Sequence, residues 1–411
     1  MSKLDELIRE FCPDGVEYKK LGEIATISRG GNFQKKDFLT EGVPCIHYGQ
    51  IYTKYGLFAD KTFTFISEEC AKKQKMARPN DIVMAVTSEN IEDVCKCLAW
   101  LGDEPVAVSG HSAIIHHNQN AKYLVYYFHS QMFFAQKRKL AHGTKVIEVT
   151  PDALVDIALP VPPIEIQCEI VRILDNFTNL TAELTAELTA RGIQYSYYRN
   201  KLLTFHSDTK IVQLADIADI GTGSSNTNEA VEDGKYPFFV RSQEPLRKND
   251  YEYDETAIIT AGDGVGVGKV YHYIEGKYAL HQRAYRIHIN TPEVMPKYYF
   301  HYMKAKFLPY IQKTMFQGSV ASIRRPMLNA FPVPVPPLDV QNRIVNVLDN
   351  FEKICSDLNI GLPAEIEARQ KQYEYYRDKL LTFAETGNTI LSRAEQSRAE
   401  QSRAEQSRAE H

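Results

Sequence analysis

Two long stretches of the chain repeat apolar residues at spacings of three and four positions. This spacing places the apolar side chains in a narrow stripe along one side of an α-helix, which is typical of helices that pack on one another. A Pro-Val-Pro-Pro run precedes each stretch and fixes where the helix begins, because proline is tolerated only in the first turn. We expect a break or kink at Gly192 and at Gly361–Pro363. The two stripes consist of Ile166, Ile170, Ile173, Leu174, Phe177, Leu180, Leu184 and Leu188, and of Val340, Ile344, Val347, Leu348, Phe351, Ile354 and Leu358.

The two stretches belong to a repeat that organises most of the chain. Residues 160–177 read PVPPIEIQCEIVRILDNF and residues 334–351 read PVPPLDVQNRIVNVLDNF. Residues 194–205 and 372–383 are identical at ten of twelve positions. A stripe in a single copy would suit a core helix, whereas two matching copies favour helices that pack on each other. Weaker echoes are the Tyr-Tyr-Phe-His runs at 126–129 and 298–301 and the pairs Gly143-Thr144 and Gly318-Ser319.

The blocks between the helical segments have a different pattern. They are rich in Gly, Pro, Tyr and β-branched residues, and short apolar runs at 81–86 and 257–261 predict strands. Each block ends in an aromatic and basic stretch that predicts a helix, at 122–140 and 297–313. We therefore expect an α+β fold with two similar domains separated by two long helices packed as an antiparallel coiled coil. The expected layout is an N-terminal segment 1–14, domains 15–163 and 209–337, helical segments 164–208 and 338–383, and a tail 384–411.

The tail repeats SRAEQ with a period of five residues, which builds no continuous apolar face on a helix, so we expect a solvated appendage. Seven sparse cysteines fit a reducing compartment. The N-terminus MSKLDELIRE is too charged for a signal peptide, and no apolar run approaches the roughly 18 residues of a membrane helix. These features predict a cytoplasmic protein without a membrane partner.

Net charge changes this picture only when it is divided by block. The 411 residues carry a formal charge of −4, which argues against a nucleic-acid binder if taken as a whole. Residues 15–158 carry +1 and residues 209–333 carry +2, so the remainder carries −7. The acidity lies in the helices and the ends of the chain, and the two blocks are free to present local basic faces.

Motifs for catalysis are missing or incomplete. The glycine-rich run 262–269 lacks both the first glycine and the Ser/Thr of a phosphate-binding P-loop, so we interpret it as a flexible turn between strands that can approach a DNA backbone. The two Pro-Pro pairs lack the polar and aromatic neighbours of an adenine methyltransferase motif, and the twelve histidines show no metal-ligand spacing. We predict no catalytic and no metal site.

Two variable blocks alternating with two near-identical helical segments resemble the specificity subunit of type I restriction-modification systems. The resemblance is carried by the two P-V-P-P-x-x-x-Q-x-x-I-V-x-x-L-D-x-F segments and by the Q-Y-x-Y-Y-R-x-K-L-L-T-F pair. It implies a non-catalytic chain in which each block reads one half of a split, asymmetric site in double-stranded DNA. It further implies that two methyltransferase subunits dock on the helices with S-adenosylmethionine, that restriction subunits add ATP- and Mg-dependent cleavage, and that this chain binds no cofactor itself.

Candidate residues follow from this resemblance and from general rules of base and phosphate contact. A scaffold that joins two protein-binding modules without DNA recognition remains the main alternative, and a nuclease is a second one. The DNA-binding candidates are Lys35, Lys36, Lys145, Arg241, Gln243, Lys269, Arg283, Arg324 and Arg325. The candidates for coiled-coil packing and methyltransferase docking are Ile170, Leu174, Phe177, Tyr197, Tyr198, Ile344, Leu348, Phe351, Tyr375 and Tyr376.

The first helical segment contains a tandem Thr-Ala-Glu-Leu repeat at 181–188. One added unit of four residues would lengthen a helix by roughly 6 Å and rotate its end by about 40°. That length is close to two base-pair steps at roughly 3.4 Å each. We therefore expect the number of these units to set the gap between two DNA half-sites.

Overall fold

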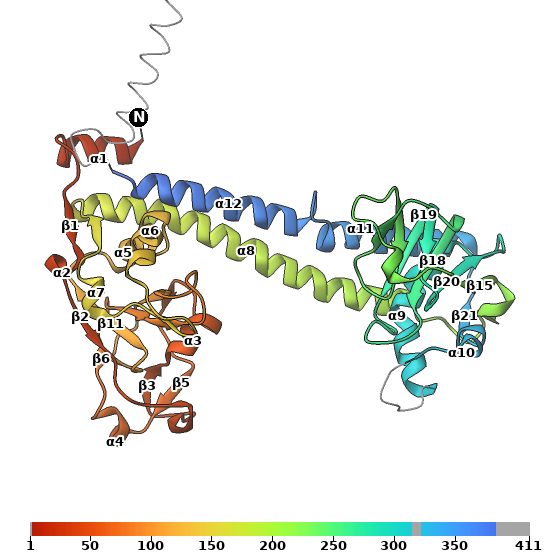
Figure 1. The fold of residues 1–411 in the computed structure, drawn as a ribbon, viewed down its shortest axis with the longest axis horizontal. Helices are drawn as coiled ribbons and strands as arrows, with labels where there is room; N and C mark the ends of the chain where they lie inside the picture. The colour runs from red at the N-terminus through yellow and green to blue at the C-terminus, as the bar shows by residue number, and fades with distance from the viewer. Residues whose placement is uncertain (1, 315–321, 384–411) are drawn as a thin grey trace, which may run out of the picture. The chain divides into compact units, whose positions relative to one another are not determined.

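The computed structural model describes residues 2–314 and 322–383. Within them the chain forms two compact units: residues up to 183 and from 367 onward form the first, and residues 184–366 the second (Figure 1). Each unit combines helices with sheets, so the predicted α+β class is confirmed. The SRAEQ tail and the Gly318-Ser319 pair lie outside the described residues.

The first unit is built around two sheets. Its strands are β1 (Tyr18–Lys20), β2 (Ala25–Arg29), β3 (Val43–Ile46), β4 (Phe58–Ala59), β5 (Thr64–Ile66), β6 (Met76–Ala77), β7 (Ile82–Ala85), β8 (Thr87–Ser88), β9 (Cys97–Trp100), β10 (Val106–Val108), β11 (Ser112–His117), β12 (Ile147–Glu148) and β13 (Ala158–Pro160). One sheet runs in the order β2-β11-β7-β9-β4 and the other in the order β5-β3-β10-β6. Two separate strand pairs, β1 with β13 and β8 with β12, complete the unit.

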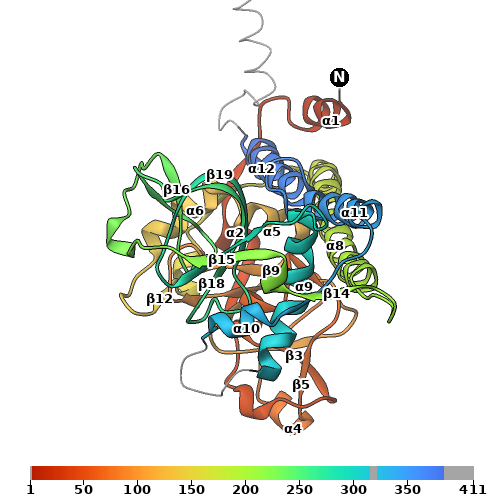
Figure 2. The ribbon, with the colours of Figure 1, turned by 90° about the vertical axis from the view of Figure 1, so that its right-hand side faces the viewer.

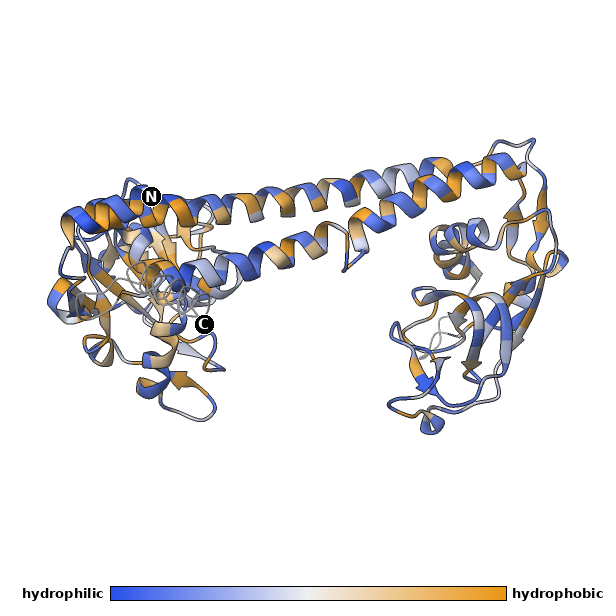
Figure 3. Ribbon diagram, turned by 90° about the horizontal axis from the view of Figure 1, so that it is seen from above, coloured by the Kyte–Doolittle hydropathy of each residue, from blue (hydrophilic) through white to orange (hydrophobic). Residues whose placement is uncertain are grey.

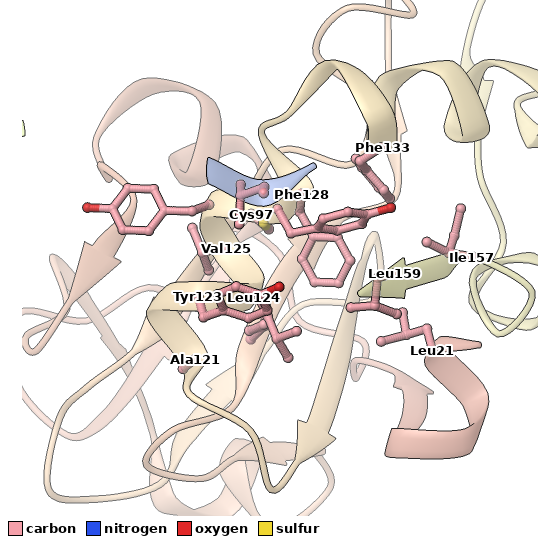
Figure 4. Close-up of a cluster of buried hydrophobic side chains, with 14 of the residues drawn as sticks. Leu21, Cys97, Ala121, Tyr123, Leu124, Val125, Phe128, Phe133, Ile157 and Leu159 are labelled. Atoms are coloured by element: carbon pink, nitrogen blue, oxygen red, sulfur yellow. The ribbon is translucent and has the colours of Figure 1, made fainter. Parts of the chain in front are cut away.

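Short helices alternate with the strands of the first unit. They are α1 (Lys3–Phe11), α2 (Leu21–Ile24), η1 (Lys35–Asp37), α3 (Tyr48–Thr53), α4 (Glu68–Ala71), α5 (Ala121–Phe128), α6 (Gln131–Leu140) and α7 (Pro151–Leu154). The predicted helix at 122–140 is divided in two, because the side chain of Ser130 accepts a hydrogen bond from the backbone of Phe133 and starts α6 anew. Every residue of α5 except Lys122 is buried, so this helix forms the centre of the core rather than its edge. Figure 4 shows side chains of this helix in one buried cluster with Cys97, Leu21, Ile157 and Leu159.

The second unit is built around one larger sheet. Its strands are β14 (Ile211–Gln213), β15 (Ala218–Thr222), β16 (Tyr236–Phe239), β17 (Leu246–Lys248), β18 (Tyr253–Ala261), β19 (Tyr271–Leu280), β20 (Ala284–Ile289) and β21 (Pro332–Pro334). The sheet order is β15-β20-β18-β19-β16-β17, and β14 pairs with β21. The shorter helices are η2 (Leu214–Asp216), η3 (Thr227–Glu229), α9 (Pro296–Thr314) and α10 (Arg325–Asn329), and α9 packs on β18 and β19 (Figure 2).

The two units share a framework that corrects one alignment made from the sequence. The hydroxyl of Tyr123 donates to the carbonyl of Pro160, and the hydroxyl of Tyr298 donates to the carbonyl of Pro334, both at 3.0 Å. Because the two prolines are equivalent in the repeat, Tyr298 corresponds to Tyr123 and not to Tyr126. Matching the two Tyr-Tyr-Phe-His runs was therefore wrong by three residues. A shift of three nearly restores the same helix face, so two aromatic-rich helices look alike in both registers.

The repeated segments form long helices. They are α8 (Ile164–Leu202), which contributes residues to both units, α11 (Leu338–Ser356) and α12 (Leu362–Leu381). The expected break at 361–363 is confirmed, whereas the expected break at Gly192 is absent. A Cβ at Gly192 would meet no atom within 4 Å, so this glycine is an open helical position that the flanking turns tolerate.

The apolar stripe of each helical segment divides into two parts. Its first part lies in the core of a unit and packs on that unit's own aromatic side chains. Farther along, Phe177 stacks on Tyr376 with ring centroids 5.4 Å apart, and Phe351 stacks on Tyr198 at 5.8 Å. Figure 3 shows apolar and polar residues alternating along these helices.

No helix in the described part of the chain is both long and apolar enough to span a membrane.

Candidate nucleic-acid interface

Strand register brings two pairs of loop residues to equivalent places in the two units. The backbone N–H just after β7 donates to the carbonyl of His111 at 3.0 Å, and the N–H just after β18 donates to the carbonyl of Arg283 at 2.9 Å. His111 and Arg283 are therefore equivalent. Thr87 and Asp263 directly follow the residues that donate these N–H groups. They are therefore equivalent as well.

A third position joins them from a neighbouring strand. The last carbonyl of β3 accepts a hydrogen bond from the backbone of Ser109 at 3.1 Å, and the last carbonyl of β16 accepts one from His281 at 2.9 Å. Tyr48 and Arg241 each lie two residues beyond these strands and are therefore equivalent. We call these positions the loop triads. They are Tyr48, Thr87 and His111 in the first unit, and Arg241, Asp263 and Arg283 in the second.

The triad of the second unit is an ion cluster with a positive excess. Asp263 accepts a hydrogen bond from Nη1 of Arg241 at 2.6 Å and another from Nη1 of Arg283 at 3.2 Å. The arginine side chains are 42% and 60% exposed, whereas the aspartate is 23% exposed. Each guanidinium has five N–H donors, and the aspartate engages one nitrogen of each. Two exposed donor groups are thus held side by side over one carboxylate.

His281 supports the turn that carries Arg283. The backbone N–H of Arg283 donates to Nδ1 of His281 at 3.0 Å. Burial lowers the pKa of His281, and the positive charges of Arg241 and Arg283 lower it further. The imidazole therefore stays neutral and keeps the lone pair that fixes this turn.

The triad of the first unit has a different chemistry in the same frame. The rings of Tyr48 and His111 lie 4.9 Å apart, and Oγ1 of Thr87 lies 3.3 Å from Nδ1 of His111. Tyr48 and His111 border a pocket of about 670 Å³ that Arg29 and Lys35 also line. This triad offers aromatic faces and neutral hydrogen-bonding groups where the second unit offers two guanidinium groups.

The glycine-rich run 262–269 forms the loop that carries Asp263, as predicted for a turn between strands. Gly264 and Gly268 have φ of 81° and 68°, a region that favours glycine. A Cβ on Gly266 would lie 2.5 Å from the carbonyl oxygen of Arg241, so only glycine permits this close approach. Val265, between these glycines, is 94% exposed and forms the apolar tip of the loop.

The structure brings together some of the nine DNA-binding candidates and separates others. Arg241 and Arg283 share one aspartate, and Lys35 lines the pocket of the first unit. The side chain of Arg325 instead donates to the backbone carbonyl of Ile220, which gives it a structural role. The remaining candidates are exposed, and Lys36 lines a second pocket of the first unit; they are Lys36, Lys145, Gln243, Lys269 and Arg324.

Four triad residues were not candidates from the sequence: Tyr48, Thr87, His111 and Asp263. The signal that identifies them is strand register between two divergent blocks, which the sequence pattern does not reveal.

The helical candidates divide by burial. Four apolar residues are at most 3% exposed in the cores of the units, where burial suits packing rather than docking; they are Ile170, Leu174, Ile344 and Leu348. Tyr197 and Tyr375 are 60% and 61% exposed. Each lies edge-on against the next tyrosine of its helix with centroids 5.3 Å apart and an interplanar angle of 77°. The repeat thus displays the same exposed aromatic pair twice.

One group in the described chain has the side chains of a metal site. His301, Asp349 and Glu352 place one potential ligand atom each within 4.8 Å of one another. Lys304 already lies 2.6 Å from Glu352, and Lys297 lies 3.8 Å from Asp349. The two carboxylates are therefore balanced by two ammonium groups, and the cluster is better described as an ion network that fastens α9 to α11.

Two like domains with repeated helices and dissimilar loop triads at equivalent places define the class of a protein with two recognition modules. The family described as "Type I restriction modification DNA specificity domain" matches this chain twice, over residues 13–191 and 206–368. The chain belongs to this family.

Relatives and solved structures agree with this assignment. The Escherichia coli type I restriction enzyme EcoR124I/EcoR124II specificity subunit is 37% identical over 251 residues, which span 54% of this chain and 61% of that protein. A putative type I restriction enzyme specificity subunit of Haemophilus influenzae is 29% identical over 311 residues, 69% of this chain and 77% of the relative. The crystal structure of the type I restriction-modification S subunit from M. genitalium has the same fold, with a TM-score of 0.56 over 90% of this chain and 97% of that one at 14% identity.

Proposed function

We propose that this chain is the DNA specificity subunit of a type I restriction-modification complex, and that each unit reads one half of a bipartite, asymmetric site. The observation that carries the proposal is the pair of loop triads, which occupy equivalent places and differ in chemistry. One shared frame with two dissimilar readers is what an asymmetric two-part site requires. In the proposed layout the readers are residues 15–163 and 209–337, and residues 164–208 and 338–383 form the connecting helices.

The test is to express the chain with its methyltransferase subunits in cells and map methylated adenines across the genome. We expect one motif made of two different half-sites at a fixed separation. A complex that assembles without methylating any defined sequence would favour the scaffold alternative.

The chemistry is assigned to the partners of this chain. S-adenosylmethionine would be held by methyltransferase subunits, and ATP and Mg by restriction subunits, with all of them acting in the cytoplasm. Purified chain incubated with DNA and magnesium should leave the DNA uncut and unmethylated. Cleavage by the purified chain would favour the nuclease alternative.

The exposed tyrosine pairs are the proposed docking points for two methyltransferase subunits. Exposed aromatic side chains are frequent anchors of protein interfaces, and two equivalent pairs suit two copies of one partner. We expect Tyr197→Ala and Tyr375→Ala each to release one methyltransferase subunit, and the double variant to release both, as read by native mass spectrometry. Tyr251→Ala is the matched control, because Tyr251 is also exposed but lies outside the helices. Unchanged stoichiometry in the double variant would exclude this surface.

The helices are proposed to form an antiparallel coiled coil that spaces the readers. The stacked pairs Phe177–Tyr376 and Phe351–Tyr198 join α8 to α12 and to α11 at equivalent positions of the repeat. The Thr-Ala-Glu-Leu repeat at 181–188 is helical within α8. Adding one unit should widen the gap in the methylated motif by about two base pairs and leave both half-sites unchanged. An unchanged gap would contradict the spacer role.

A further inference from the structure

We infer that Arg241 and Arg283 recognise a guanine in the half-site of the second unit, and that Asp263 positions them. This inference rests on the proposed function and adds to it the base and the side chains that select it.

The first argument is the geometry of the donors. Guanine presents two acceptors, O6 and N7, to the major groove, and a guanidinium group is the side chain that most often engages both. Two guanidinium groups placed side by side without a counter-charge would repel each other. Asp263 lies within 2.6 Å and 3.2 Å of their nitrogens, which removes this repulsion and restricts both side chains. The donors are therefore arranged before DNA arrives, which lowers the entropy lost on binding.

The second argument is where the cluster lies. Its three residues follow three different strands, β16, β18 and β19, so the sheet itself fixes their spacing. Gly266 lets the loop pass against the backbone of Arg241, and Val265 extends from that loop almost fully exposed. A surface ion pair contributes little to folding, so stability alone gives little reason for this arrangement. An apolar tip beside paired donors instead suits a groove in which bases present both acceptors and methyl groups.

The third argument is the contrast with the first unit. Its equivalent residues, Tyr48, Thr87 and His111, include no guanidinium group. Arg29 lines the pocket beside them and is paired with Glu148, but it is a single guanidinium group outside the triad. Because the frame is common to both units, the arginine pair gives a preference for guanine only to the half-site that the second unit reads.

The decisive variants keep the positive charge and remove the planar guanidinium group. Lysine retains the positive charge of arginine but cannot present two parallel donors to one base. In the complete complex, Arg283→Lys and Arg241→Lys should each weaken the preference for guanine at one position of one half-site. The ratio of methylation at the original motif to methylation at the motif with the best alternative base should fall roughly 5- to 150-fold. Asp263→Asn should relax the same position while thermal unfolding is unchanged. Arg138→Ala, which removes an exposed charge on α6, should leave the motif intact.

The outcomes separate this inference from the proposed function. If the wild-type complex methylates a bipartite motif but both lysine variants methylate it unchanged, the arginines contact phosphate or solvent and the inference fails. A wild-type motif without guanine in the half-site that these variants affect would overturn it as well. If the wild-type complex has no bipartite motif at all, the proposed function itself fails.

Discussion

The two units of this protein share a frame of strands and helices that the same residue types stabilise. They differ at the loops that this frame carries. Gln167 and Gln341 are 1% and 0% exposed and make matching hydrogen bonds, whereas the loop triads share no residue type. The comparison separates two tasks within one repeat. The frame fixes where loops emerge from the sheet, and the loops are then free to vary without a cost to folding.

The glutamines show how strictly the frame is specified. Oε1 of Gln167 accepts the backbone N–H of Asn120 at 3.0 Å, and Oε1 of Gln341 accepts that of Met295 at 2.8 Å. Nε2 of each donates to a carbonyl of its own proline run, of Pro162 or of Pro336, at 2.8 Å. One side chain thus connects the start of a long helix to the start of the helix that fills the core.

Replacing either glutamine should have the largest effect on the shared frame. Gln167→Leu and Gln341→Leu should each destabilise their own unit by about 3–5 kcal/mol, because several buried backbone groups lose their partners together. The single tryptophan, Trp100, lies in the first unit, so its fluorescence follows that unit in a urea titration. Circular dichroism follows both units.

Gln167→Leu should move the fluorescence transition, whereas Gln341→Leu should move only the circular dichroism signal. Gln243→Leu serves as the control, because that glutamine is exposed. Equal effects of both frame variants on Trp100 would mean that the units do not unfold separately.

The sequence predicted the frame well and the site poorly, for a physical reason. Helix periodicity and the proline runs predict the first residue of α8 and of α11 to within one position. These signals are local, because a helix depends on neighbours three and four positions away. The loop triads depend on backbone pairs between segments about 20 to 60 residues apart, which leave no local signal. Arg241 and Arg283 were candidates only as exposed basic residues. Asp263, which brings them together, was hidden in a run interpreted as a turn.

Acid should affect the two units differently. Burial lowers the pKa of His117 and of His129 in the first unit to about 4. In the second unit burial also lowers the pKa of His272, His281 and His301, but nearby carboxylates act in the opposite direction at each of them. Unfolded histidines bind protons below about pH 6.5, whereas these buried ones do not until the pH is much lower. Stability is therefore complete above about pH 6.5 and is lost as the pH falls toward 4.

At pH 5 the first unit should have lost on the order of 2 kcal/mol for each of His117 and His129 relative to pH 7. The Trp100 transition should then move more than the transition of the second unit. His117→Gln should remove about half of this acid shift, and His142→Gln, at an exposed position, should remove none. An acid shift of equal size in both units would contradict the asymmetry.

The smallest expected effect concerns the helices, where the comparison predicts equality. Phe177 stacks on Tyr376 at an interplanar angle of 22°, and Phe351 stacks on Tyr198 at 27°. Double-mutant cycles with leucine at each position should give a coupling of about 0.5–1.5 kcal/mol in each pair, and the two values should agree within the error of the cycle. Leucine keeps much of the apolar area, so the coupling reports the ring contact itself. A coupling in only one unit would mean that the repeated helices are joined unequally, and that the frame is then less symmetric than its hydrogen bonds indicate. Equal couplings would leave the loops as the place where the two halves of the molecule differ.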